Sequence, residues 1–242
     1  MTLLCLDAGN TRLKWGLREG GRWRVQGARP HADTGTLAAV LPVRPERILA
    51  CNVAGAAVAA RIAALADTLG APLDWFASRP VQGGVTNGYD DPAQLGPDRW
   101  AALVGARALP AGPALVVMAG TATTIDVLEA DGRFAGGLIL PGLALMAEAL
   151  ARNTACLPAA HGGYRDCPTN TDDAIVSGAV HATLGAIERM ARRLAGVDFC
   201  VILSGGAADL LAPHLDFLPV MRVDNLVLEG LARAASAEDA RG

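Results

Sequence analysis

Residues 7–14 have the sequence Asp-Ala-Gly-Asn-Thr-Arg-Leu-Lys and follow an apolar run from Leu3 to Leu6. The apolar run predicts a buried strand, and the small residues after it predict a tight turn into a second strand. Backbone N–H groups in such a turn bind phosphate oxygens, and Lys14, the only lysine of the chain, adds a positive charge. Asp7 stands at the strand end, where a carboxylate holds Mg²⁺ directly or through water. The segment therefore predicts a phosphate-binding hairpin, with an ordinary hairpin closed by an Asx turn as the alternative.

The same pattern returns in the second half of the chain. An apolar run at residues 114–118 leads into Gly120-Thr121-Ala122-Thr123-Thr124-Ile125-Asp126, which again offers backbone amides, hydroxyls and a carboxylate. A threonine-rich strand is the alternative. A third turn, Ser204-Gly205-Gly206, follows a buried run and would let adenine or ribose approach the backbone, unless it is a plain strand-to-helix turn. Two phosphate-type hairpins at equivalent places in two halves favour nucleotide binding.

The remaining pattern predicts an α/β protein made of two similar halves. Each half begins with three strands, connected by a small-residue turn and a glycine hairpin, and continues with alternating helices and strands. We expect strands at residues 3–6, 13–17, 22–26, 47–52, 73–76, 114–118, 134–140 and 199–203, and one that follows the Gly120 turn and ends at residue 128. We expect helices at residues 55–69, 98–109, 171–194 and 226–235, and two further helices that begin at residue 34 and after residue 142. The predicted domains are residues 1–112 and 113–242, with both phosphate turns at one cleft.

A further motif precedes the predicted boundary. Residues 95–100 have the sequence Leu-Gly-Pro-Asp-Arg-Trp, after Asn87-Gly88-Tyr89 and Asp91-Pro92. Phosphoryl transfer to an alcohol uses a carboxylate near the hydroxyl as base and cations that offset phosphate charge. Asp98 and Arg99, at a Gly-Pro turn that opens a helix, would supply both groups. The alternative is an aspartate that caps the helix beside a solvent-facing arginine.

Composition excludes several classes of protein. The net charge of −3 argues against nucleic acid as the main partner, and no apolar run approaches the ~20 residues that span a bilayer. The N-terminus lacks the regions of a signal peptide. The cysteines are scattered, which predicts reduced thiols, a cytoplasmic location and no zinc site. The isolated histidines are interpreted as surface or helix-end residues. The cysteines are Cys5, Cys51, Cys156, Cys167 and Cys200, and the histidines are His31, His161, His181 and His214.

The three turns together resemble the phosphate and adenosine motifs of the superfamily that contains acetate kinase, sugar kinases, heat-shock chaperones and actin. That resemblance implies two ribonuclease-H-like, actin-like subdomains of mixed β-sheet with flanking helices and an active site in the cleft between them. More specifically, the chain resembles the type III pantothenate kinases, also known as Bvg accessory factors. The matching segments occur in the family's order: residues 7–14, 87–89, 95–100, 119–126, 136–143, 170–178 and 204–211.

The resemblance implies a kinase that uses ATP to convert pantothenate to 4′-phosphopantothenate, the first step of coenzyme A biosynthesis. Mg²⁺ would accompany ATP, with Asp7 near the metal. The implied ATP contacts are Asp7, Ala8, Gly9, Asn10, Thr11, Arg12, Leu13, Lys14 and Thr121. The implied pantothenate contacts are Tyr89, Gly96, Pro97, Asp98, Arg99 and Thr171, with Asp98 as the general base for the pantothenate hydroxyl. The family forms homodimers, so Thr171 could reach the substrate across a dimer interface.

One position departs from the family pattern. The family commonly has an aspartate two residues before the glycine of the second phosphate motif, where it binds a monovalent cation, K⁺ or NH₄⁺. This chain has Met118 at that position. A thioether is a poor ligand for a hard cation. Either the cation dependence is absent here, or another group supplies the charge.

Two other functions fit parts of the pattern. An actin-like kinase for another small alcohol would use the same phosphate turns with a different acceptor. A non-catalytic transcription-accessory protein would need neither the base nor the acceptor segment. The base, the acceptor segment and both phosphate turns occur together, which favours catalysis. Pantothenate itself follows from the resemblance only, because the spacing indicates no more than a phosphoryl acceptor.

Overall fold

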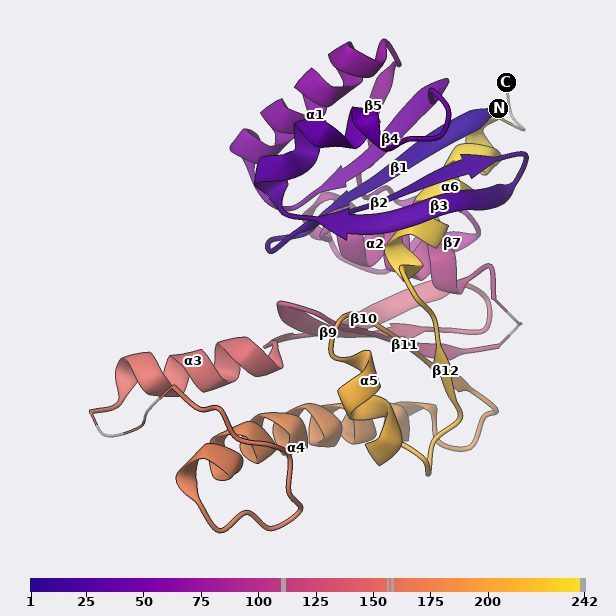
Figure 1. The fold of residues 1–242 in the computed structure, drawn as a ribbon. Helices are drawn as coiled ribbons and strands as arrows, with labels where there is room; N and C mark the ends of the chain where they lie inside the picture. The colour runs from indigo at the N-terminus through magenta and orange to yellow at the C-terminus, as the bar shows by residue number, and fades with distance from the viewer. Residues whose placement is uncertain (110–111, 156, 158, 240–242) are drawn as a thin grey trace. The chain divides into compact units, whose positions relative to one another are not determined.

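The computed structural model describes residues 1–109, 112–155, 157 and 159–239, and divides the chain into two compact units (Figure 1). The first unit comprises Met1–Ala111, Gly132–Phe134 and Asn225–Gly242, and the second comprises Gly112–Asp131 and Ala135–Asp224. The pattern-based division into residues 1–112 and 113–242 follows the chain, whereas these units also group segments that are distant in sequence. One of the cysteines assigned as reduced thiols, Cys156, lies outside the described residues.

The first unit contains a five-stranded mixed sheet in the order β3-β2-β1-β4-β5. Its strands are β1 (Thr2–Ala8), β2 (Leu13–Glu19), β3 (Arg22–Arg29), β4 (Arg47–Asn52) and β5 (Leu73–Trp75). β1, β2 and β3 are antiparallel neighbours, and β4 and β5 run parallel to β1. The predicted order of strand, small-residue turn, strand, glycine hairpin and strand is confirmed here.

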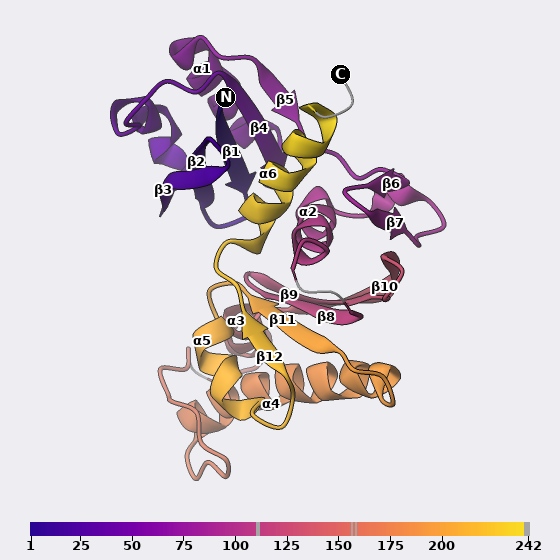
Figure 2. The same cartoon turned by 90° about the vertical axis from the view of Figure 1, so that its right-hand side faces the viewer.

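Helices cover both faces of this sheet (Figures 1 and 2). Helix α1 (Ala56–Leu69) and the 3₁₀-helix η1 (His31–Ala39) pack on the face that carries Leu4 and Leu6. Helices α2 (Pro97–Ala106) and α6 (Leu226–Asp239) pack on the opposite face. Because side chains alternate along a strand, Asp7 lies on the α2 face, whereas Leu6 and Ala8 lie on the α1 face.

The C-terminal helix belongs to the first unit because small residues let it approach α2 closely. A Cβ atom at Gly230 would overlap the carbonyl of Ala101, and one at Gly105 would lie 2.7 Å from the carbonyl oxygen of Leu226. A hydrogen bond also ties α6 to β3: Trp23 Nε1 donates to Glu229 Oε1 at 2.7 Å. The helix therefore supports the sheet face that carries Asp7.

A small hairpin completes the described part of the first unit. Strands β6 (Val81–Gln82) and β7 (Val85–Asn87) pair with each other, and the 3₁₀-helix η2 (Pro92–Gln94) follows. The first residues of β10 (Arg133–Pro141) pair with β7, with Phe134 opposite Asn87. Buried Trp100 fixes the hairpin to α2, because its Nε1 donates to Gln82 Oε1 at 2.9 Å.

The second unit contains a sheet in the order β12-β11-β8-β9-β10. Its elements are β8 (Ala114–Ala119), β9 (Ala122–Leu128), the remainder of β10, α3 (Leu143–Asn153), α4 (Thr171–Ala191), η3 (Arg192–Leu194), β11 (Cys200–Ser204), α5 (Ala208–Leu211), η4 (Ala212–His214) and β12 (Val220–Arg222). Helix α4 buries Val180, Leu184 and Ile187 against the face of the sheet that carries Leu115 and Val117. Both units thus have the α/β architecture that the sequence predicts.

Several elements differ from the expectation. The helix expected from residue 34 is a 3₁₀-helix that begins at His31, and the helix expected to end at residue 109 ends at Ala106. β6, β7, β12 and α5, which have four residues or fewer, were not predicted. Within the part of the chain that the structure describes, no helix is long and apolar enough to cross a membrane.

Candidate active site

The first phosphate motif forms a hairpin turn at the end of β1. Asp7 pairs with Lys14 and Ala8 with Leu13, so the residues from Gly9 to Arg12 make the turn. The end of β1 is fixed because Val53 N donates to the carbonyl oxygen of Ala8 at 3.0 Å. The side chains of residues 10–12 are exposed. The turn is therefore anchored at its base and open to solvent at its tip.

Asp7, the carboxylate of the motif, is buried at this strand end. Burial, the main cause, raises the pKa of its carboxyl group from 3.8 to about 6; the positive charge of Lys14 lowers this pKa, and the negative charge of Asp98 raises it further. All three residues lie in the first unit. The structure thus brings together the predicted magnesium ligand, the predicted phosphate-binding cation and the predicted base.

Gly9 is not required by the packing of the turn itself. A Cβ atom at this position would lie 3.8 Å from Arg12 O, which is an ordinary contact. Gly205, in the third motif, is different: its φ is +104°, and a Cβ atom there would overlap the carbonyl of Ala119. Glycine at position 205 serves the fold, whereas the bare backbone at position 9 leaves room for a ligand.

The acceptor motif lies at the N-terminus of α2. Asp98 is half-buried in the first turn, and its Oδ1 accepts a hydrogen bond from Arg99 N at 2.8 Å. A Cβ atom at Gly96 would lie 2.7 Å from Asp98 Oδ1, so this carboxylate packs closely against the Gly96 backbone. Pro97 occupies the first helical position, where its missing N–H is not needed. The turn thus orients the Asp98 carboxylate on the rigid end of a buried helix.

Arg99 is buried, which excludes the solvent-facing arginine considered for this position. The residue is 5% exposed, and its Nη1 donates a hydrogen bond to the Tyr89 hydroxyl at 2.7 Å. The guanidinium carbon also lies 5.5 Å from the centre of the Tyr89 ring and 5.8 Å from that of Phe134. The two rings contact each other, with centroids 5.4 Å apart. Arg99 is therefore held by cation–π contacts with both rings and by a hydrogen bond.

The loop that carries Tyr89 is organised by Asn87. Asn87 Oδ1 accepts from Tyr89 N at 3.0 Å, and its Nδ2 donates to the carbonyl oxygens of Arg79 and Pro92 at 3.4 and 3.3 Å. Sequence reasoning grouped Asn87 with Tyr89 but missed Phe134. The chain places Phe134 beside Tyr89 through the pairing of β10 with β7, a long-range contact without a local signal.

In the second unit the structure brings the second phosphate motif and the adenosine motif together. Residues 120–121 form the turn between β8 and β9, and the exposed Thr121 uses its carbonyl to accept from Gly142 N at 2.9 Å. Ala207 N donates to the carbonyl oxygen of Ala119 at 3.0 Å, and Gly205 packs on the same residue. The turns after β8 and β11 are therefore neighbours.

Met118 lies one residue before the end of β8. The strand register places it between Thr124 of β9 and Ser204 of β11, on the sheet face opposite α4. Thr124 Oγ1 and Ser204 Oγ are buried and have no hydrogen-bond partner among the described residues. Asp126 is fully buried and packs against Gly137. Among the described residues no three His, Cys, Asp or Glu side chains group in a way that could hold a metal ion.

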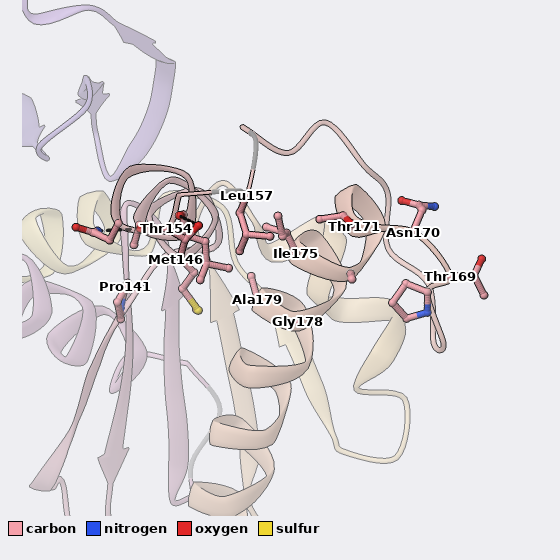
Figure 3. Close-up of a pocket in the computed structure, with 15 residues that line it drawn as sticks. Pro141, Met146, Thr154, Leu157, Thr169, Asn170, Thr171, Ile175, Gly178 and Ala179 are labelled. Atoms are coloured by element: carbon pink, nitrogen blue, oxygen red, sulfur yellow. Dashed lines mark hydrogen bonds between the residues drawn. The ribbon is translucent and has the colours of Figure 1, made fainter.

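Thr171 lies elsewhere in the second unit, at the N-terminus of α4, where Asn170 Oδ1 accepts from Asp173 N at 2.9 Å. It lines an apolar cavity of about 1070 Å³ between α3 and α4. Figure 3 shows Met146, Leu157 and Ile175 around this space, with Thr169 and Asn170 at its edge. No residue of α3 is buried. The cavity is thus bounded on one side by a helix that packs only loosely on its own unit.

Comparison with known proteins identifies the family. The family model of type III pantothenate kinases matches residues 3–193. The type III pantothenate kinase of Aromatoleum aromaticum is 52% identical over 241 residues, which cover 98% of this chain and 99% of the relative. The type III pantothenate kinase of Dechloromonas aromatica is 48% identical over 242 residues, which cover 96% of this chain and 98% of the relative.

Solved structures support the fold. A Campylobacter jejuni protein, described as a Baf family transcriptional activator, matches with a TM-score of 0.66 at 18% identity, over 98% of this chain and 99% of its own. The apo ParM protein of pSK41 matches with a TM-score of 0.52 at 10% identity, over 99% of this chain and 98% of the ParM chain. The two-unit actin-like fold is therefore confirmed, and the chain belongs to the type III pantothenate kinase family.

Proposed function

We propose that this chain transfers the γ-phosphoryl group of ATP to pantothenate and releases ADP and 4′-phosphopantothenate, the first step of coenzyme A biosynthesis. Family membership over nearly the whole chain supports the reaction and the acceptor. The observation that carries the proposal is that Lys14 pairs with Asp7 across the β1–β2 hairpin, and that α2, which carries Asp98, packs on the sheet face of Asp7. A metal-binding carboxylate, a phosphate-binding cation and a base are the groups that this transfer needs.

ATP binding is assigned to the two phosphate turns. The proposed contacts are Asp7, Ala8, Gly9, Asn10, Thr11, Arg12, Leu13 and Lys14 in the first unit and Thr121 in the second. Asp7 would hold Mg²⁺, which prefers few carboxylate oxygens together with phosphate oxygens. The site fits a cation, because a buried carboxyl group with a raised pKa gains stability from a positive charge beside it. When bound, the ion offsets charge on the phosphate oxygens.

Pantothenate binding is assigned to the N-terminus of α2 and the loop before it. The proposed contacts are Tyr89, Gly96, Pro97, Asp98 and Arg99, with Thr171 from the second unit. Asp98 is the proposed base: its carboxylate takes the hydroxyl proton, the hydroxyl oxygen bonds to the γ-phosphorus, and the bond to the ADP oxygen breaks. Arg99 offers a fixed positive charge to an acceptor that carries a carboxylate.

A monovalent cation does not fit the residues around Met118. A hard cation prefers oxygen ligands, and here a thioether stands between two hydroxyl groups where the family has a carboxylate. The proposed reaction is therefore independent of K⁺ and NH₄⁺, and no step depends on such an ion.

A homodimer is proposed for the second unit. Helix α3 has no buried residue, and the apolar cavity between α3 and α4 exposes Leu150 on its rim. A second copy of the chain would cover this surface. Thr171 lines the same cavity, which supports its assignment as a substrate contact near a dimer interface. The scattered cysteines support a cytoplasmic location, and the net charge of −3 supports a small molecule rather than nucleic acid or a membrane as the partner.

An acceptor panel tests the proposed function. Purified protein is incubated with ATP and Mg²⁺ and with pantothenate or other small alcohols, and products are identified by mass. The proposal predicts a phosphorylated product from pantothenate and little from the other alcohols. Phosphorylation of another alcohol in preference would favour a different actin-like kinase, and no product with any acceptor would favour a non-catalytic accessory protein.

A further inference from the structure

We propose that His31 is a positioning residue for the ATP phosphates: its ring holds the Gly9 carbonyl and so fixes the direction of the Asn10 N–H. The two residues lie in the first unit, and His31 Nε2 is 2.7 Å from Gly9 O. The inference rests on the proposed assignment of the β1–β2 turn to ATP. It assigns a role to a histidine that sequence spacing had placed among surface or helix-end residues.

The hydrogen bond defines the state of the ring. A carbonyl oxygen only accepts, so Nε2 carries the hydrogen and donates to Gly9. The other ring nitrogen, Nδ1, is buried and has no partner among the described residues. Within the described part of the chain, the His31 ring therefore forms its hydrogen bond with Gly9. This favours the interpretation that the ring stabilises the β1–β2 turn rather than the packing of η1.

The peptide geometry carries the effect to the ligand side. In a trans peptide the C=O of one residue and the N–H of the next point in opposite directions. The Gly9 carbonyl points to His31, so the Asn10 N–H points away from η1. The tip of the turn is open to solvent, since the side chains of Asn10 and Arg12 are both exposed. An N–H held in this way is a donor for a phosphate oxygen.

His31 is itself held firmly. It is the first residue of η1, and its carbonyl accepts a hydrogen bond from Thr34 Oγ1 at 2.8 Å. Thr34 is fully buried, and Asp33 N donates to the carbonyl oxygen of Pro30 at 3.0 Å. The ring is therefore presented by a fixed first turn, which is what a positioning residue needs.

The test compares His31→Phe, His31→Gln and Thr36→Ala. Phenylalanine keeps the ring and removes the donor, whereas the glutamine amide places an N–H close to the position of Nε2. Thr36→Ala is the matched control: it removes a hydrogen bond from Arg29 within the η1 region and leaves Gly9 untouched. Each protein is assayed for the KM values of ATP and pantothenate, for kcat, for binding of a non-hydrolysable ATP analogue and for Tm.

The proposal predicts that His31→Phe raises the KM for ATP and the Kd of the analogue about tenfold, the effect of losing one positioned hydrogen bond. The KM for pantothenate and the Tm should match those of Thr36→Ala, and His31→Gln should recover most of the loss. Unchanged nucleotide affinity in His31→Phe would overturn the proposal, as would equal losses in Phe and Gln.

The binding arm separates this proposal from the proposed reaction. If the wild type binds the analogue but shows no pantothenate-dependent turnover, the acceptor assignment fails and the analogue affinities of the variants still decide the role of His31. If the wild type binds no nucleotide, both proposals fail.

Discussion

The negative charge of Asp98, at the N-terminus of α2, helps to raise the pKa of Asp7 at the end of β1 to about 6. The two carboxyl groups come from different elements that meet on one face of the first sheet. Their proximity has a physical consequence: with both ionised they repel each other, and a cation near Asp7 relieves the repulsion. The arrangement suits a site that receives Mg²⁺ and phosphate beside a base.

Replacing the base should stop turnover and keep nucleotide binding. We expect Asp98→Asn to lower kcat by about 10²–10⁴-fold, the usual contribution of a general base. Analogue binding should persist, because the asparagine Oδ1 can still accept from Arg99 N. Asp91→Asn is the control, since Asp91 caps η2 through Ala93 N and has no proposed catalytic role. Steady-state kinetics and calorimetric titration measure the two effects. Full activity of Asp98→Asn would refute the assignment of the base.

Asp7→Asn should stabilise the protein while it abolishes activity. The folded-state pKa is raised from 3.8 to about 6, so the folded carboxylate is penalised at pH values above 6 and the penalty disappears as pH falls toward 4. The variant should exceed the wild type by roughly 1–3 kcal/mol in the free energy of unfolding at pH 8, from about 1.4 kcal/mol per pKa unit. The difference should vanish near pH 4. Denaturant titrations at both pH values measure it, and an Asn variant that is less stable at pH 8 would contradict the pKa shift.

The glycines of the first and third motifs should respond differently to alanine. Gly9→Ala should leave the free energy of unfolding within about 0.5 kcal/mol of wild type, because its Cβ meets no close neighbour. Its KM for ATP should rise about tenfold or more if phosphate approaches the bare backbone. Gly205→Ala should instead destabilise the fold by about 2 kcal/mol or more, because alanine is strained at its φ of +104° and overlaps Ala119.

Thermal unfolding and ATP kinetics on both variants separate the two effects. A destabilised Gly9→Ala protein with normal ATP affinity would assign Gly9 to the fold instead of the ligand.

Because Met118 replaces the aspartate of the family pattern, the activity should not depend on K⁺ or NH₄⁺. ADP release should be the same within about twofold in K⁺, NH₄⁺ and Na⁺ buffers of equal ionic strength, because the sheet offers a thioether where a hard cation needs oxygen. Met118→Asp should introduce a preference for K⁺ or NH₄⁺. Strong stimulation of the wild type by K⁺ would show that another group supplies the missing charge.

Local sequence patterns predicted the parts of the site that single turns build. The hairpin of β1 and β2, with Asp7 opposite Lys14, follows from an apolar run and a small-residue turn. The start of α2 follows from Gly96 and Pro97. These features depend on neighbouring residues, so the sequence carries them directly.

Long-range packing set the rest. Phe134 reaches Tyr89 through the pairing of β10 with β7, and Arg99 is buried because those rings surround it. The close packing of α6 on α2 depends on Gly105 of α2, which lies against α6, and on Gly230 of α6, which lies against α2. No local sequence pattern indicates this pairing. His31 was overlooked for the same reason: its partner, Gly9, lies on another element.

The central claim is tested most directly by ADP release from purified protein with ATP and Mg²⁺, in the presence and absence of pantothenate. The account predicts ADP release that depends on pantothenate and saturates with its concentration. ADP release that is absent, or that is the same with and without pantothenate, would contradict the proposed phosphoryl transfer and the role of Asp98 in it.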